Sequence, residues 1–151
     1  IDIRYLKYVI CMSIIESKKE HIKNAGLKVT TARVVILGIF EQKPNAHFSA
    51  EDLYHVLVAE GYDFSLATVY RVLTQFEKAG MLMKHRFEEE KSVYELASDE
   101  HHDHLVCVKC GKIEEFNDSI IEQRQVEVAK KFNFKMTEHS LSMYGLCNVC
   151  Q

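Results

Sequence analysis

Two Cys-x-x-Cys pairs, Cys107–Cys110 and Cys147–Cys150, constrain the fold of this chain more than any other feature of its sequence. Two such pairs can complete a tetrahedron of thiolates, each about 2.3 Å from one zinc ion. The alternative is that the cysteines form disulfide bonds or remain as unpaired core thiols. Two arguments disfavour it: the same Cys-x-x-Cys spacing occurs twice, and disulfide bonds are rare in the cytosol, where we expect this protein. A site closed by four thiolates has no open coordination position. The sequence therefore predicts a structural zinc ion, and not a catalytic one, at the end of a small domain.

A structural metal suits a chain of this size. The 151 residues fit one ordinary domain or two small ones, and two half-size cores are marginal without a staple. No apolar run approaches the roughly 18 residues that a membrane span requires. The first eleven residues carry Asp2, Arg4 and Lys7 and lack an Ala-x-Ala site, so they make a poor signal peptide. We expect a cytoplasmic protein with no membrane partner.

Charge is divided unequally along the chain. Residues 1–87 carry 12 Lys and Arg against 9 Asp and Glu, a net charge of +3, whereas residues 88–151 carry 7 against 13, a net charge of −6. The basic half suits a polyanion such as nucleic acid, and the acidic half, with four of the five cysteines, suits cations. We expect an extension of unknown role over residues 1–11, a DNA-binding domain over 12–97 and a metal-binding domain over 98–151.

The first half reads as a winged helix-turn-helix. Helices are predicted over residues 12–25, 31–42, 50–60 and 65–79, with a capping box at Ser49-Ala-Glu-Asp52. A hairpin of strands 81–87 and 92–96 follows, with its turn at 88–91. In the fourth helix the apolar residues fall on one stripe, which leaves Arg71 and the border residue Tyr70 exposed. Arg71 could bind phosphate or guanine, and Tyr70 could pack on thymine methyl groups or bind a phosphate. An ordinary solvated helix face is the alternative. The candidate DNA-contacting residues are Lys28, Arg33, Thr68, Tyr70 and Arg71.

The second half reads as a small α/β domain that opens with a polar joint at 98–100. Strands are expected over 105–108, 112–116 and 134–144, with a helix over 118–132. If the segment His101-His-Asp-His104 is extended, His102 and His104 point to one face, and His101 and Asp103 to the other, so one segment can supply two sites. Imidazole and carboxylate donors suit Fe²⁺, Zn²⁺, Co²⁺ or Mn²⁺. The alternative is a polar surface loop. Three other histidines, at positions 21, 55 and 85, are expected to be surface residues.

Four segments, in this order, carry a resemblance to the ferric uptake regulator family: residues 26–30 (GLKVT), 47–54 (HFSAEDLY), 66–73 (LATVYRVL) and 101–116 (HHDHLVCVKCGKIEEF). The resemblance extends from about residue 27 to residue 150. It implies an α+β fold in which a winged-helix domain precedes a dimerisation domain with a Cys₄ zinc site. It also implies a homodimer that binds an AT-rich inverted repeat, with Lys28 in the minor groove. The sequence does not tell whether dimers pair into tetramers.

The resemblance further implies two sets of metal ligands besides the structural zinc. A regulatory site would comprise His47, Glu95, His102, His104 and Glu115, and an additional site His101, Asp103, Glu122 and His139. Peroxide sensors of the family carry Asp where this chain has Glu95 and Glu115, and zinc-uptake regulators often use Cys near the regulatory site. We therefore expect Fe²⁺, with Mn²⁺ or Zn²⁺ able to substitute. Ala32 stands where many relatives have proline at the start of the second helix. We expect this difference to leave metal binding and DNA binding unchanged.

The resemblance and the ligand types together predict an iron(II)-responsive repressor of iron-uptake genes, to which there are three alternatives. The nearest is a regulator of the same family that senses zinc, manganese or peroxide. The second is a winged-helix protein that zinc staples but no effector controls. The third is a metallohydrolase, because the same donors around an ion can activate water; we expect no enzymatic activity, since hydrolysis demands an open coordination position and a substrate pocket.

Overall fold

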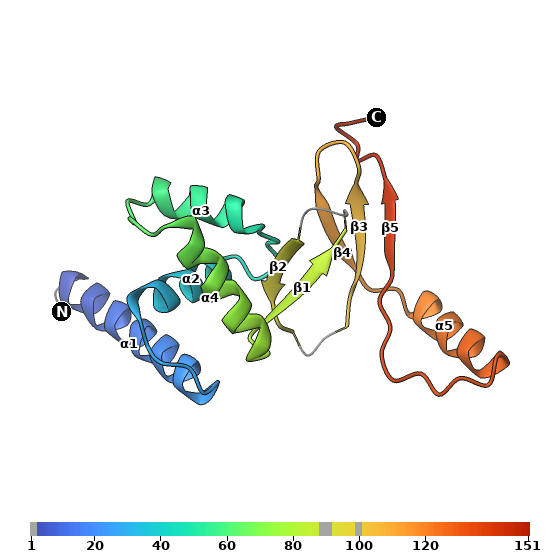
Figure 1. Ribbon diagram of the computed structural model, residues 1–151, viewed down its shortest axis with the longest axis horizontal. Helices are drawn as coiled ribbons and strands as arrows, with labels where there is room; N and C mark the ends of the chain where they lie inside the picture. Colours follow the sequence, from blue (N-terminus) through green and yellow to red (C-terminus); the bar gives the residue numbers. More distant parts are fainter. Residues whose placement is uncertain (1–2, 88–91, 99–100) are drawn as a thin grey trace. The chain divides into compact units, whose positions relative to one another are not determined.

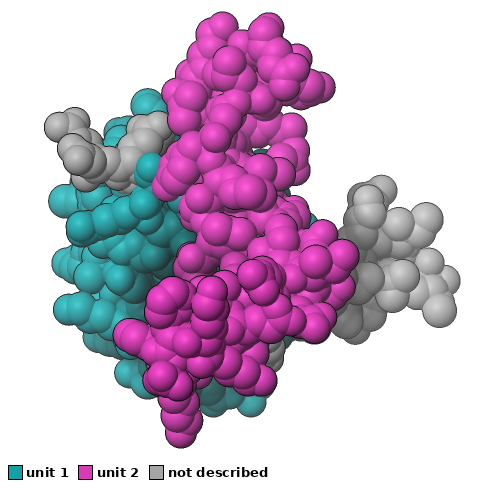
Figure 2. Space-filling view, turned by 90° about the vertical axis from the view of Figure 1, so that its right-hand side faces the viewer, with its two compact units in different colours: residues 1–97 teal, residues 98–151 magenta. Residues whose placement is uncertain are grey.

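The computed structural model describes residues 3–87, 92–98 and 101–151, with side chains from residue 13 onward. The chain divides into two compact units, residues 1–97 and 98–151 (Figure 2). The predicted hairpin turn at 88–91 and most of the predicted joint at 98–100 lie outside the described residues.

The first unit contains four helices and then a two-stranded hairpin, as predicted for a winged helix (Figure 1). The elements are α1 (Ile3–Asn24), α2 (Thr31–Gln42), α3 (Ala50–Ala59), α4 (Leu66–Lys78), β1 (Leu82–Arg86) and β2 (Ser92–Leu96). The strands β1 and β2 are antiparallel and pair Leu82 with Leu96. An isolated bridge between Phe48 and Tyr94 joins the segment before α3 to β2.

Helix α1 is longer than expected. The helix was expected to begin at residue 12, after an extension over residues 1–11, but in the structure it begins at Ile3. The reason is local, because no Pro or Gly interrupts residues 3–11. Among the helices that the structure describes, none is both long and apolar enough to cross a membrane.

Side-chain caps fix where the next three helices begin. Thr30 and Ser65 accept backbone N–H groups at the starts of α2 and α4. At α3, the Ser49 hydroxyl accepts from the Asp52 N–H while the Asp52 carboxylate accepts from the Ser49 N–H, which confirms the predicted capping box. A cap of this kind contributes about 1 kcal/mol to stability. The caps therefore fix the first residues of α2, α3 and α4.

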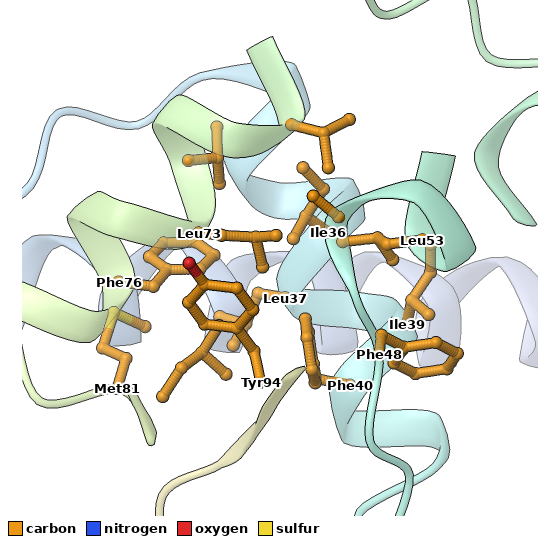
Figure 3. Packing of buried hydrophobic residues seen from close by; sticks show 14 of the residues in the cluster. Ile36, Leu37, Ile39, Phe40, Phe48, Leu53, Leu73, Phe76, Met81 and Tyr94 are labelled. Carbon is orange, nitrogen blue, oxygen red and sulfur yellow. The ribbon is translucent and has the colours of Figure 1, made fainter. Parts of the chain in front are cut away.

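The core of the first unit lies between α2, α3, α4 and the hairpin. Phe40, Phe76 and Leu73 are fully buried there, and Tyr94 of β2 closes the core from the hairpin side (Figure 3). The α4 stripe predicted from the sequence is confirmed, since Val69, Leu73 and Phe76 face inward. Burial of one such side chain contributes about 1.5–3 kcal/mol. Packing therefore fixes which face of α4 points outward.

The second unit contains a three-stranded sheet and one helix. The elements are β3 (Asp103–Cys107), β4 (Ile113–Phe116), α5 (Ser119–Lys131) and β5 (Ser142–Gly145). In the sheet order β4-β3-β5, β3 is antiparallel to β4 and parallel to β5. The central strand β3 begins at Asp103, two residues earlier than expected, so it includes half of the histidine-rich segment.

The strand expected over residues 134–144 is wrong for most of its length. Only residues 142–145 form β5, and residues 135–141 are irregular. The register gives the reason: His104 pairs with Ser142, and the His104 N–H donates to the Leu141 carbonyl. Residues before Leu141 therefore extend past the first residue of β3, where they have no strand to pair with.

Candidate metal centres and nucleic-acid interface

The four paired cysteines converge at one end of the sheet in the second unit. Their sulfur atoms all lie within 4.8 Å of one another, and Cys110 Sγ is 3.7 Å from Cys147 Sγ. None of the four is in a disulfide bond. The two Cys-x-x-Cys turns follow β3 and β5, so the parallel pairing of these strands brings the turns together. The arrangement matches what a tetrahedral zinc ion requires.

Backbone groups prepare these thiols for a metal. The Cys147 N–H donates to Cys107 Sγ at 3.4 Å. This bond and one from the Cys110 N–H lower the pKa of Cys107 to about 6. A hydrogen bond from the Val149 N–H lowers the pKa of Cys147. By contrast, hydrogen bonds to the neighbouring sulfurs of Cys147 and Cys110 raise the pKa of Cys150 to about 12. Thiolate formation is therefore favoured at Cys107 and Cys147, one cysteine from each pair, where a cation would offset the negative charge.

A second group of donors lies on one face of β3 and joins it to α5. His101 Nε2 is 3.3 Å from an oxygen of Asp103 and 3.2 Å from Glu122, in the first turn of α5. His139 Nε2 is 2.7 Å from the other oxygen of Glu122, and the rings of His101 and His139 are 4.1 Å apart. Asp103 is fully buried, and among the described residues its Oδ2 has no hydrogen-bond partner. A buried carboxylate oxygen without a donor fits a metal ligand.

The opposite face of β3 carries a different set. The rings of His102 and His104 are 5.0 Å apart, and His104 pairs with Glu115 of β4 across the sheet. The ligand atoms of His102 and Glu115 lie within 4.8 Å of each other. The predicted alternation is therefore confirmed: His101 and Asp103 face one way, and His102 and His104 face the other.

In the first unit, Glu95 of β2 lies between two histidines. His47 Nε2 is 2.7 Å from one carboxylate oxygen of Glu95, and His85 Nε2 of β1 is 2.6 Å from the other. The prediction that His85 is a surface residue is wrong, because its side chain is only 17% exposed and contacts Glu95. Strand alternation places His85 on the face opposite Lys84, but its contact with Glu95 depends on the cross-strand register.

The outward face of α4 presents the residues expected to meet DNA. Tyr70 and Arg71 are exposed, on the side opposite the buried stripe. The Tyr70 hydroxyl donates a 2.5 Å hydrogen bond to Glu51 of α3, and this bond raises the pKa of Tyr70. The hydroxyl is thus held by the protein, while the ring and the Arg71 side chain face solvent.

Two of the other candidate DNA-contacting residues also make contacts within the first unit. The Arg33 guanidinium donates to the Lys28 carbonyl and, at 2.7 Å, to the Gln75 side chain of α4. It therefore ties the segment of Lys28 to the exposed helix. The Thr68 hydroxyl lies 3.0 Å from that of Ser65, at the N-terminal cap of α4.

A winged helix with an exposed helical face, followed by a unit rich in metal ligands, defines a metal-dependent, DNA-binding transcriptional regulator. The family model described as the ferric uptake regulator family matches residues 24–144. A ferric uptake regulation protein of Legionella pneumophila is 56% identical over 134 residues, which cover 89% of this chain and 98% of that protein. The chain belongs to the ferric uptake regulator family.

Solved structures agree with this assignment. The ferric uptake regulator of Francisella tularensis, solved with iron, has a TM-score of 0.78 and 43% identity, covering 83% of this chain and 95% of that one. The Helicobacter pylori regulator, described as having three functional metal binding sites, has a TM-score of 0.78 and 35% identity, covering 92% of each chain. The predicted α+β fold class is therefore confirmed.

Proposed function

We propose that this protein is a cytoplasmic, iron(II)-responsive repressor of iron-uptake genes. The observation that carries the proposal is the grouping of imidazole and carboxylate donors in both units. His47 and Glu95 are adjacent in the first unit, and His102, His104 and Glu115 share one face of the sheet in the second. We propose these five residues as the ligands of the regulatory ion.

Two further sites complete the metal content. Cys107, Cys110, Cys147 and Cys150 hold a structural Zn²⁺, which the convergence of their sulfurs supports. The additional site comprises His101, Asp103, Glu122 and His139, supported by the buried oxygen of Asp103. Both sites lie within the second unit. Metal at either one would stabilise this small unit, whose own apolar core is limited.

The donor chemistry favours iron at the regulatory site. Nitrogen and carboxylate oxygen donors disfavour Cu⁺, which prefers thiolates, and accept Fe²⁺, Mn²⁺ or Zn²⁺. The two glutamates, where peroxide sensors of the family carry aspartates, favour a ferrous sensor. Because Zn²⁺ binds such ligands more tightly than Fe²⁺ at equal concentration, regulators of zinc, manganese or peroxide remain the alternative.

The DNA-binding form is proposed to be a homodimer on an AT-rich inverted repeat. Arg71 and the Tyr70 ring would read the major groove and Lys28 the minor groove, with Arg33 and Thr68 supporting them. The second unit supports dimerisation, because no residue of α5, described throughout, is buried although the helix carries Ile121 and Val128. These side chains line an open groove of about 740 Å³. Pairing of dimers into tetramers is a further possibility of the same proposal.

In this proposal the ion controls DNA affinity because it binds the DNA-competent form of the protein more tightly than the other form. An ion that binds the DNA-competent form a hundredfold better raises DNA affinity by at most that factor, about 2.7 kcal/mol. A dimer recognises half-sites only at particular separations, about one helical turn or its multiples. Ligands supplied by both units give the ion a means to select the form with the correct spacing.

A mobility-shift titration on an inverted-repeat operator at fixed salt tests the function. Anaerobic Fe²⁺, or Mn²⁺ as its air-stable substitute, should tighten binding, and His102→Ala or Glu115→Ala should abolish the response while the protein still folds. Equal affinity with and without metal would contradict a sensing role and favour the zinc-stapled alternative. Turnover of hydrolysable substrates without metal-dependent DNA binding would favour a metallohydrolase.

Metal analysis of protein purified anaerobically from its own cytosol, compared with His102→Ala, identifies the ion.

A further inference from the structure

The hairpin register brings His85 to Glu95. In the pairing of β1 with β2, Met83 lies opposite Glu95 and His85 lies opposite Val93. Residues opposite each other, and those two positions along, share one face of an antiparallel pair. His85 and Glu95 are therefore diagonal neighbours on one face, while Tyr94 points into the core from the other.

The Glu95 carboxylate is held at both oxygens. One is 2.7 Å from His47 Nε2, next to the Phe48 bridge, and the other is 2.6 Å from His85 Nε2. A carboxylate that binds a metal through one oxygen can rotate unless a hydrogen-bond donor holds its second oxygen. His85 occupies the position of such a donor, on the oxygen that His47 does not contact.

The His85 ring is itself held in place. The Phe87 ring stacks on it with centroids 5.4 Å apart and an angle of 4° between the planes. Phe87 also approaches the His47 ring, at 6.4 Å. The aromatic side chain thus restricts rotation of His85 and leaves its Nε2 directed at Glu95.

From these contacts we propose that His85 is a positioning residue, which orients Glu95 as a ligand of the regulatory metal without binding the ion. The inference rests on the proposed metal-binding role of Glu95. Hydrogen-bond partners of metal ligands fix their orientation, and losing one typically lowers metal affinity about 10- to 100-fold.

The test compares three variants in the full-length chain, zinc-loaded at the cysteines and carrying His139→Ala to silence the additional site. His85→Leu removes the hydrogen bond, and His85→Gln keeps an amide donor of similar reach. His55→Leu, at an exposed histidine of α3, is the matched control. Mn²⁺ affinity is measured by chelator competition, and electron spin echo spectroscopy counts the imidazole nitrogens bound to Mn²⁺.

We expect His85→Leu to bind Mn²⁺ about 10- to 100-fold more weakly, His85→Gln to recover part of this loss, and the control to be unchanged. The number of bound imidazoles should be the same in all of them. Loss of one imidazole in His85→Leu would overturn the positioning role, because His85 would then be a ligand. Unchanged Mn²⁺ affinity with lowered stability to urea would also overturn it and leave a purely structural role.

A Glu95→Ala variant separates this inference from the proposed function. If Glu95→Ala loses Mn²⁺ binding and His85→Leu does not, the inference fails and the metal site stands. If Glu95→Ala binds Mn²⁺ like the parent, then Glu95 is no ligand and the proposed site fails, and with it the role of His85.

Discussion

At the residue scale, the proposed role of Tyr70 in DNA binding rests on its ring and not on its hydroxyl. Its hydroxyl donates to Glu51, so contact with phosphate would require breaking a charged hydrogen bond. We predict that Tyr70→Phe changes specific DNA affinity less than about threefold, whereas Tyr70→Ala costs about 1–3 kcal/mol through lost contact with the bases. Competition mobility shifts at saturating metal measure both. An equal loss in the two variants would show that the hydroxyl itself binds DNA.

Cys107 gives a pH-dependent prediction for the zinc-free protein. Hydrogen bonds from the Cys147 and Cys110 N–H groups lower the pKa of Cys107 to about 6 in the folded chain, against an ordinary value of 9.0. Because the folded pKa is lowered, the stabilising effect is full above about pH 9 and is lost as the pH falls through about 6. Thiolate absorbance near 240 nm should therefore show a first step with a midpoint near pH 6.

Replacing Cys107 by Ser is the control for this titration and should remove the step. Cys150→Ser should leave it in place, since the pKa of Cys150 is raised to about 12 and this thiol stays protonated through the neutral range. A first midpoint at the ordinary thiol value in the parent protein would contradict the hydrogen-bond arrangement.

Individual residues also show which side-chain arrangements can be predicted from a sequence. The convergence of the cysteines and the two faces of residues 101–104 follow from short spacings and strand alternation, so both could be predicted. The partnership of His85 with Glu95 could not, because it depends on which residues of β1 and β2 face each other. The contacts of the Arg33 guanidinium with Lys28 and Gln75 could not be predicted either, because they depend on how α2 packs against α4.

At the element scale, the contacts that hold α5 in place are made by polar side chains and not by buried apolar ones. It has no buried residue, yet Glu122 in its first turn binds His101 and His139. We predict that Mn²⁺ or Zn²⁺ at about ten times Kd slows amide exchange in α5 about tenfold, since such an excess stabilises by about 1.4 kcal/mol. Exchange measured by mass spectrometry checks this. Glu122→Gln should abolish the effect, and protection persisting in that variant would contradict the additional site.

Helix boundaries were predictable where a cap marks them, and strand lengths were not. Ser49 and Ser65 begin α3 and α4 where expected because their hydroxyls satisfy local N–H groups. The strand expected from residue 134 fails because its length depends on a remote partner, the start of β3 at Asp103. Local chemistry sets helix ends, whereas tertiary pairing sets strand ends.

At the scale of the whole molecule, the groove along α5 predicts how two copies associate. Val128 lines the groove, whereas Ile120 on the same helix does not, and the two are 43% and 77% exposed. A charge buried without a partner at an interface costs several kcal/mol. We therefore predict that Val128→Asp dissociates the dimer at micromolar concentration, measured by sedimentation equilibrium, while the matched variant Ile120→Asp remains dimeric.

Dissociation should carry over to DNA binding, because two half-sites are engaged together only by a dimer. Val128→Asp should bind an inverted repeat and a single half-site with similar, weak affinity. Ile120→Asp should keep its preference for the repeat, and zinc content at the cysteines should be equal in both, which excludes misfolding of the second unit. If Val128→Asp remained dimeric, the groove along α5 would not be the interface, and the surface that pairs two copies would lie elsewhere.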